Sequence, residues 1–182
     1  MGIEHICIVQ EFYIKVGPFR ERSDLFLMQY KCYTINMTIF IGADHRGYQL
    51  KDKIISYIQD KNIRVEDLGN YEYDPHDDFP DYAQKVAQAV LQNPTDHLGI
   101  VICGSGAGVS IAANRFKGIY SVVGLNSEHV ADSRRDDHIN VLALAANFTS
   151  EEEAEKIVDA YLGAKPAHAE KYLRRLKKVD SI

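Results

Sequence analysis

The sequence predicts an α/β fold, in which one three-layer domain carries helices on both faces of a five-stranded parallel sheet. Short apolar runs alternate with longer segments of helical periodicity along most of the chain. Strands that alternate with helices are joined by right-handed crossovers, which leave the strands parallel. The length agrees with a single domain, because 182 residues, 46% of them hydrophobic, can form one substantial core.

Residues 1–36 do not follow this alternation. They mix apolar and charged residues without a sustained period, and Gly17-Pro18 is a turn signal. We therefore expect an N-terminal extension over 1–36 that is poorly ordered and lies outside the core, and a domain over 37–182. The alternative is an ordinary extra element packed on that domain.

Five short runs are predicted as strands, because they have the aliphatic character of parallel strands buried on both faces. They lie at 38–42, from Val65 onward, and at 98–102, 119–124 and 139–144.

Helices are predicted where apolar residues recur at helical spacing. One of them begins at Ser150, which forms a capping box with Glu153, and ends at Gly163, where glycine tolerates the left-handed conformation. The apolar stripes are Leu50, Ile54 and Ile58; Tyr82, Val86 and Val90; Ile111 and Ala112; Ala154, Ile157, Val158, Tyr161 and Leu162; and Tyr172, Leu176 and Val179.

Composition excludes several classes of protein. A net charge of -5 gives no basic field for nucleic acid or for an anionic membrane. No apolar run approaches the ~20 residues of a transmembrane helix, and Glu4 and His5 precede the first aliphatic run where a signal peptide would be basic. Three cysteines without metal-type spacing fit a reducing compartment, so we expect a cytoplasmic protein.

The strongest local signal is the glycine-rich turn after the third predicted strand, Cys-Gly-Ser-Gly-Ala-Gly at 103–108. Glycines let a backbone approach a ligand closely, and the unpaired N–H groups that open a helix bind anionic oxygen and favour a thiolate. Cys103 stands at the carboxyl end of its strand, where open α/β sheets bind ligands. Val109 stands where a dinucleotide fingerprint has its third glycine, and no Gly-Lys-Ser/Thr follows. For the glycines alone, a turn without function is the alternative.

Two further patterns are weaker. Asp44 and His45 follow the first predicted strand, at the same edge of the sheet as Cys103. Taken alone, Asp44 is better explained as a cap of the next helix. Lys171, Arg175 and Lys178 form a basic stripe on the last helix, which is either a solvated face or a phosphate clamp.

Six segments, collinear from about Met37 to about Val179, resemble the ribose-5-phosphate isomerase B family, which also includes galactose-6-phosphate isomerase subunits. The most specific are Gly-Ala-Asp-His-Arg-Gly at 42–47 and the turn at 103–108; the others lie at 78–83, 110–115, 140–143 and 158–163. The resemblance implies a flavodoxin-like, Rossmann-type fold and a homodimer with active sites at its interface. It also implies a phosphorylated sugar as substrate and neither a metal nor a nucleotide cofactor.

The resemblance also implies roles for individual residues. Cys103 takes the proton at the sugar carbon next to the carbonyl, and Ser105 assists transfer between the two oxygens. The backbone from Gly104 through Gly106 and Ala107 to Gly108 holds the enediolate oxygen. The residues that contact the sugar or its phosphate are Asp44, His45, Asp137, Lys171 and Arg175.

The chain departs from the family at two positions. Asp136 stands where the family has a histidine thought to open the sugar ring, and His138 lies two residues further on. Asn147 stands where the family has an arginine that helps to bind phosphate. We expect His138 to open the ring, with Asp136 and Asp137 orienting its imidazole. The alternative is that neither Asp136 nor His138 opens rings and that the protein favours open-chain substrates.

Three alternatives compete with an isomerase of ribose 5-phosphate. One is an isomerase of a six-carbon aldose phosphate, and another is a non-catalytic sugar-phosphate-binding subunit, which Asp136 and Asn147 favour. The third, a phosphorelay receiver, is rejected because Cys103 occupies the place of its phospho-acceptor aspartate.

Overall fold

The computed structural model describes residues 8–9, 12–13 and 37–182. The chain divides into two compact units, Met1–Cys32 and Tyr33–Ile182. In the first, β1 (Ile8–Val9) pairs antiparallel with β2 (Phe12–Tyr13). Most of residues 1–36 lie outside the described residues, so their predicted poor order stays a prediction. The domain boundary at 36/37 also stays a prediction.

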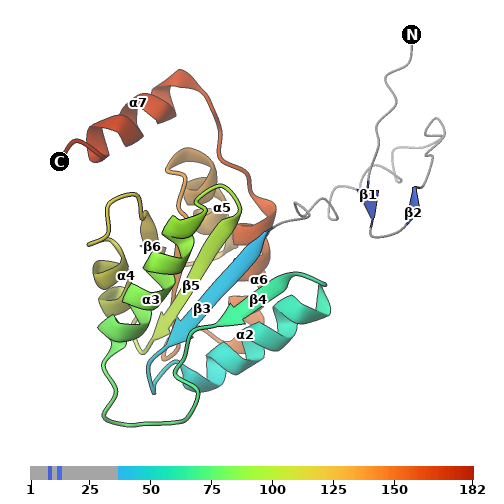
Figure 1. Ribbon diagram of the computed structural model, residues 1–182, viewed down its shortest axis with the longest axis vertical. Helices are drawn as coiled ribbons and strands as arrows, with labels where there is room; N and C mark the ends of the chain where they lie inside the picture. Colours follow the sequence, from blue (N-terminus) through green and yellow to red (C-terminus); the bar gives the residue numbers. More distant parts are fainter. Residues whose placement is uncertain (1–7, 10–11, 14–36) are drawn as a thin grey trace. The chain divides into compact units, whose positions relative to one another are not determined.

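The second unit contains the five-stranded parallel sheet that the sequence predicts (Figure 1). The strands pair in the order β4-β3-β5-β7-β6, and every pairing is parallel. Their bounds are β3 (Thr38–Ala43), β4 (Arg64–Asp67), β5 (His97–Cys103), β6 (Ser121–Val123) and β7 (Val141–Ala145). The three central strands, β3, β5 and β7, are buried along almost their whole length, as their aliphatic sequences require.

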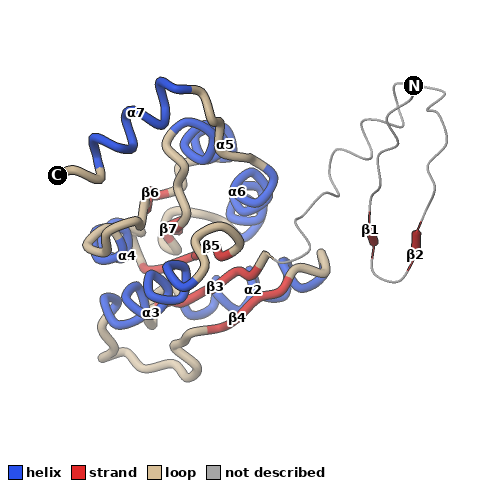
Figure 2. Tube along the Cα trace, turned by 45° about the horizontal axis from the view of Figure 1, so that its top comes forward, coloured by secondary structure: helices blue, strands red, loops and turns tan. Residues whose placement is uncertain are grey.

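Helices cover both faces of this sheet, which confirms the three-layer α/β fold (Figure 2). One core joins the sheet to α2 (Tyr48–Asp60), α5 (Ser127–Asp136) and α6 (Glu151–Gly163). The other core joins it to α3 (Phe79–Gln92) and α4 (Ala107–Ala113), and Cys103 belongs to this second face.

The sequence pattern did not predict α5. Only Val130 and Ser133 of its ten residues are buried, so no apolar stripe marks it. Its beginning carries a different signal, since the Asn126 side chain accepts the backbone N–H of His129 as an N-cap does. Its end makes Asp136 the last residue of a helix.

The structure confirms the predicted beginning of α6 but not its predicted end, and it shows that α6 and α7 differ in burial. Ser150 Oγ accepts the N–H of Glu153, as the capping signal predicts. The left-handed glycine predicted at the end of α6 is wrong: Gly163 is the last helical residue with a negative φ, and Ala164 leaves the helix in an extended conformation. α7 (Glu170–Val179) has no buried residue in the single chain.

Because all five strands are parallel, the segments that follow them gather at one edge of the sheet, the carboxyl edge, and those that precede them lie at the opposite, amino edge. Figure 1 shows α7 at the end of the domain where the strands begin, and the loop before α3 at the end where they finish. No helix within the described residues is long and apolar enough to cross a membrane.

Candidate functional site

Cys103 is the last residue of β5, so it lies at the carboxyl edge of the sheet, and it is 5% exposed. Its Sγ accepts the backbone N–H of Gly106 at 3.2 Å. Gly106 has a φ of 71°, and a Cβ there would come within 3.0 Å of the Val123 side chain, so only glycine fits this position without strain. The side chains of Ser105 and Ala107, in the turn that follows, are exposed.

The turn after β3 packs against the end of β5, next to Cys103. Asp44 is buried, and its Oδ1 accepts the backbone N–H groups of Arg46 and Gly47 at 2.9 and 3.0 Å. Burial raises the pKa of Asp44, although these two hydrogen bonds oppose the shift. Asp44 therefore closes the turn that precedes α2, which is close to the capping role that the sequence left open.

His45 has a fixed orientation. Its backbone N–H donates to Asp77 Oδ1 at 3.0 Å, and its Nδ1 lies 2.7 Å from the same oxygen. Burial would raise the pKa of Asp77, but hydrogen bonds from His45 and Asn70 outweigh it and lower that pKa. An ionised carboxylate only accepts hydrogen bonds, so Nδ1 carries the proton and Nε2 of the neutral ring keeps a lone pair for a ligand.

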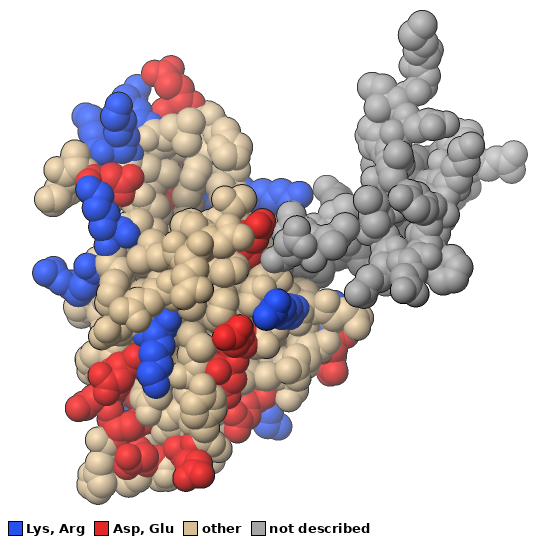
Figure 3. Space-filling view, viewed as in Figure 1, with Lys and Arg blue, Asp and Glu red and all other residues tan. Residues whose placement is uncertain are grey.

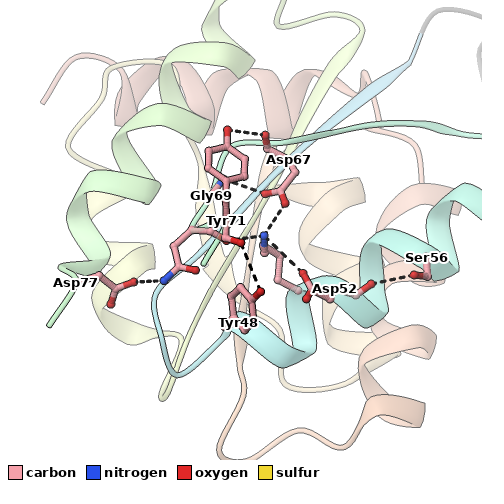
Figure 4. A network of polar contacts seen from close by, with 9 residues as sticks. Tyr48, Asp52, Ser56, Asp67, Gly69, Tyr71 and Asp77 are labelled. Carbon is pink, nitrogen blue, oxygen red and sulfur yellow. Dashed lines mark hydrogen bonds and ion pairs between the residues drawn. The ribbon is translucent and has the colours of Figure 1, made fainter. Parts of the chain in front are cut away.

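A buried lysine belongs to the polar network that includes Asp67 and Asp77 (Figure 4). Lys51, on α2, is 1% exposed, and its ammonium donates to the Asp67 carboxylate and to the Asn70 carbonyl. The Asn70 side-chain amide donates in turn to Asp77 Oδ2 at 2.7 Å. A continuous set of hydrogen bonds therefore links the interior of α2 to His45.

Sequence reasoning missed Lys51, Asn70 and Asp77. Asp77 lies in a segment so rich in acidic residues that none of them stood out. Lys51 did carry a signal, because it stands three and seven residues before Ile54 and Ile58, on the stripe that packs into the core. A lysine on such a stripe requires buried partners.

The segment after β7 closes the other side of the site. The backbone N–H groups of Ala146 and Asn147 donate to the carbonyls of Cys103 and Gly104, at 2.9 and 3.0 Å. Since β5 lies between β3 and β7, the residues that follow three neighbouring strands converge around Cys103. The structure thus brings together Cys103, the turn to Gly108, Asp44 and His45.

The remaining predicted site residues do not join this cluster. His138 precedes β7, whose first residue pairs with Gly99, whereas Cys103 pairs with Ala145 at the other end of the strand. Four strand residues separate the two pairings, roughly 13 Å along the sheet. Asp136 and Asp137 lie with His138 at the amino edge, so one chain alone cannot bring them to the thiol.

At the amino edge, Asp136 forms an ion pair with the neighbouring Arg135 at 2.8 Å, and this hydrogen bond lowers the pKa of Asp136. His138 has a φ of 56°, in the left-handed region, and its Nε2 lies 2.9 Å from the Ala167 carbonyl. A carbonyl only accepts, so Nε2 carries the proton and Nδ1 holds the lone pair of the neutral ring.

Lys171 and Arg175 are exposed on α7. The end of this helix is tied to the amino edge by a 2.6 Å hydrogen bond from the Tyr120 hydroxyl to Asp180, because Tyr120 directly precedes β6. Both cations therefore belong to the amino edge. In the part of the chain that the structure describes, no three His, Cys, Asp or Glu side chains are grouped as a metal site would require.

Comparison with known proteins places this site in context. The family described as Ribose/Galactose Isomerase matches residues 39–179. The chain is 45% identical over 130 residues to the probable ribose-5-phosphate isomerase B of Mycoplasma pneumoniae, covering 71% of this chain and 85% of that protein. It is 41% identical over 126 residues to ribose-5-phosphate isomerase B of Escherichia coli, covering 69% and 83%.

The solved structures give the same result. Ribose-5-phosphate isomerase B from Mycoplasma genitalium with bound ribulose-5-phosphate superposes with a TM-score of 0.76 at 39% identity, over 80% of this chain and 95% of that one. The Thermotoga maritima enzyme superposes with a TM-score of 0.75 at 38% identity, over 80% and 99%. The chain therefore belongs to the ribose/galactose isomerase family, as its six segments predicted.

Proposed function

We propose that this protein interconverts ribose 5-phosphate and ribulose 5-phosphate, with Cys103 as the base. The observation that carries the proposal is the position of that thiol: at the carboxyl edge, beneath a glycine turn, with the Gly106 N–H directed at its sulfur. The Mycoplasma genitalium relative binds ribulose-5-phosphate, which favours a five-carbon substrate over a six-carbon one. The cysteine pattern supports the cytoplasm as the compartment.

In the proposed mechanism the Cys103 thiolate takes the proton from C2 of the open-chain aldose. The electrons of the C–H bond form the C1=C2 double bond, and the carbonyl oxygen becomes an enediolate oxygen that the backbone N–H groups between Gly104 and Gly108 stabilise. The Ser105 hydroxyl relays the proton of the C2 hydroxyl to O1. The Cys103 thiol then returns its proton to C1, which leaves the carbonyl at C2.

Two effects contribute to the proposed rate enhancement, namely the positioned base Cys103 and the preorganised N–H donors of the glycine turn. A positioned base contributes about 10²–10⁴-fold, and one preorganised oxyanion donor about 10²–10³-fold. His45 Nε2, left free by the bond between Nδ1 and Asp77, accepts a hydrogen bond from a sugar hydroxyl. Asp44 contributes its second carboxylate oxygen, since the two backbone N–H groups bind Oδ1.

We propose further that the complete site needs two copies of the chain. Cys103 lies at the carboxyl edge, whereas His138 and Arg175 belong to the amino edge, so a twofold-symmetric dimer that apposes the two edges would unite them. Charge supports this apposition. In Figure 3, Lys and Arg gather over α7 at the top, and Asp and Glu gather at the bottom, around the loop that leads into α3. Complementary charge steers such an association.

Ring opening is assigned to His138. A proton must leave the anomeric hydroxyl and another must reach the ring oxygen, and an imidazole can serve both steps. Asp136 cannot donate, because the Arg135 hydrogen bond keeps it ionised. Nδ1 of His138 is the nitrogen left for this chemistry, since Nε2–H is bound to the Ala167 carbonyl. Asp137 is exposed beside it and contacts the substrate.

Proton exchange tests the activity directly. The protein is incubated in D₂O with a panel of five- and six-carbon aldose phosphates, and loss of the C2 proton is followed by NMR. Exchange and ketose formation should be fastest with ribose 5-phosphate. Faster turnover of a six-carbon phosphate would reassign the substrate, and binding without exchange in any member of the panel would make the protein a sugar-phosphate-binding subunit.

Complementation tests the two-chain site. Cys103→Ala and Arg175→Ala chains are unfolded together, refolded as a mixture and assayed well below the wild-type KM. If each site takes Cys103 from one chain and Arg175 from the other, half of a random mixture is heterodimer with one intact site of two. Activity should then recover to about a quarter of the wild-type rate. No recovery would mean that both residues serve a site within one chain.

A further inference from the structure

Arg46, which follows His45, also lies against the glycine turn. Its side chain is exposed, unlike that of Asp44. A Cβ atom on Gly104 would lie 2.9 Å from Arg46 Nε and 3.0 Å from its Cδ. The stem of the guanidinium group therefore crosses the backbone directly beside Cys103, and only the missing side chain of Gly104 leaves room for it.

The backbone of Arg46 is held in this place. Its N–H donates to Asp44 Oδ1 at 2.9 Å. A Cβ on the next residue, Gly47, would lie 2.7 Å from the Ile102 carbonyl oxygen, so the turn is pressed against the end of β5. The position of Arg46 over the glycine turn thus follows from the packing of two adjacent strands.

A second donor lies against Gly104, near the same position. Asn147 Nδ2 would lie 3.0 Å from the same Cβ position, and the Asn147 backbone N–H binds the Gly104 carbonyl. Donors from the segments after β3 and β7 therefore converge on the same position of the turn. Of the two, only Arg46 carries a charge.

The charge of Arg46 is not neutralised locally. Within residues 37–182 its guanidinium makes no ion pair and no hydrogen bond, although this part of the chain carries an excess of acidic groups elsewhere on its surface. A guanidinium presents several N–H groups in a planar fork that matches phosphate oxygens. An unpaired fork beside the reacting thiol is suited to a dianionic group of the substrate.

We propose that Arg46, assisted by the Asn147 amide, binds the phosphate group of the sugar phosphate from the chain that supplies Cys103. This inference rests on the proposed function and adds a residue to it. Lys171 and Arg175 lie at the amino edge, so they cannot fix the phosphate relative to Cys103 within one chain. Arg46 can, because its backbone is anchored to the end of the strand that carries the thiol.

The test compares Arg46→Ala and Arg46→Lys with wild type and with Arg64→Ala as a matched control. Arg64 is exposed at the start of β4, at the amino edge, where its guanidinium approaches Glu66 at 3.9 Å. KM and kcat for ribose 5-phosphate are measured together with the binding of inorganic phosphate to the resting protein by calorimetry. Melting temperatures report folding.

Arg46→Ala should raise KM by about tenfold to a hundredfold, the range of a lost hydrogen bond to a charged group, and leave kcat within about threefold. Phosphate binding should weaken by a similar factor. Arg46→Lys should lie between Arg46→Ala and wild type, because it keeps the charge and loses the fork. Arg64→Ala should match wild type in all measurements.

Unchanged KM and unchanged phosphate binding in Arg46→Ala would overturn the proposal while leaving the isomerase activity intact. A fall in kcat at constant KM would also overturn it, since Arg46 would then act on the chemical step. Wild-type protein that turns over no sugar phosphate refutes the proposed function instead; the phosphate titration, which needs no turnover, still decides whether Arg46 binds phosphate.

Discussion

Gly106→Ala tests the turn around Cys103 most directly. At a φ of 71°, any residue with a Cβ is in a left-handed conformation that costs about 1–2 kcal/mol. The new methyl group would also lie 3.0 Å from Val123 Cγ1 and 3.3 Å from the Ala145 backbone nitrogen, and overpacking of this kind costs about 1–3 kcal/mol. The free energy of unfolding should therefore fall by roughly 2–5 kcal/mol in total.

For a domain of this size, that loss lowers Tm by roughly 4–20 °C. Urea unfolding and thermal unfolding followed by circular dichroism measure it. Gly163→Ala is the matched control, because Gly163 is helical and its Cβ would have no heavy atom within 4 Å. That change should raise the free energy of unfolding by up to about 1 kcal/mol.

Gly106→Ala should also affect catalysis. Any shift of the backbone at Gly106 moves the N–H that donates to the Cys103 sulfur. We expect kcat to fall by about tenfold or more at a temperature where the variant is fully folded. A Gly106→Ala protein within about 0.5 kcal/mol of wild type would refute the left-handed turn and the tight packing around it.

Cys103→Ala should lose at least about 100-fold in kcat while its Tm stays close to wild type, and Cys103→Ser should keep only a trace; near-wild-type turnover would make Cys103 an ordinary core thiol. The lowered pKa of Asp77 means that this carboxylate stabilises the fold above its ordinary pKa of 3.8 and that the contribution disappears as the pH falls below that value. Asp77→Asn should therefore show a shallower loss of stability in acid urea titrations, and an unchanged slope would contradict the His45–Asp77 pair. His138→Ala should cripple turnover of cyclic ribose 5-phosphate but spare proton exchange on ribulose 5-phosphate, and equal loss in both would point to a structural histidine. A chain that begins at Met37 should match the full chain in Tm and turnover, whereas a large drop in Tm would show that the first 36 residues belong to the core.

The sequence was sufficient for the sheet because each central strand is a run of aliphatic residues bounded by glycine or polar residues. Thr38–Ala43 and His97–Cys103 each extend the predicted run by only one or two residues. The edge strand β6 is the least accurate, three residues long against six predicted, since an edge strand pairs on one side only. α5 escaped prediction because one buried valine and one buried serine leave no periodic pattern.

For the site, the sequence predicted the residues beside the glycine turn. It did not predict the residues that hold them in place. Cys103 and Asp44 follow strands, so parallel topology alone places them at one edge. Asp77 supports the site through side-chain hydrogen bonds to His45, 32 residues earlier, and to Asn70, 7 residues earlier. The first pairing joins a loop to a distant turn, and no local sequence pattern encodes it. The same parallel topology puts His138 at the opposite edge, because His138 precedes β7 whereas Cys103 ends β5.

The depth of Cys103 has a consequence for redox chemistry. Because the residue is only 5% exposed, a reagent has little access to the sulfur. Hydrogen peroxide should therefore reach the sulfur more readily than glutathione, because a tripeptide needs more exposed surface to react. Oxidative damage should therefore advance from sulfenic to sulfinic acid without the protection that a mixed disulfide gives to exposed thiols. If the sugar phosphate binds at this thiol as proposed, saturating substrate should slow the oxidation of Cys103.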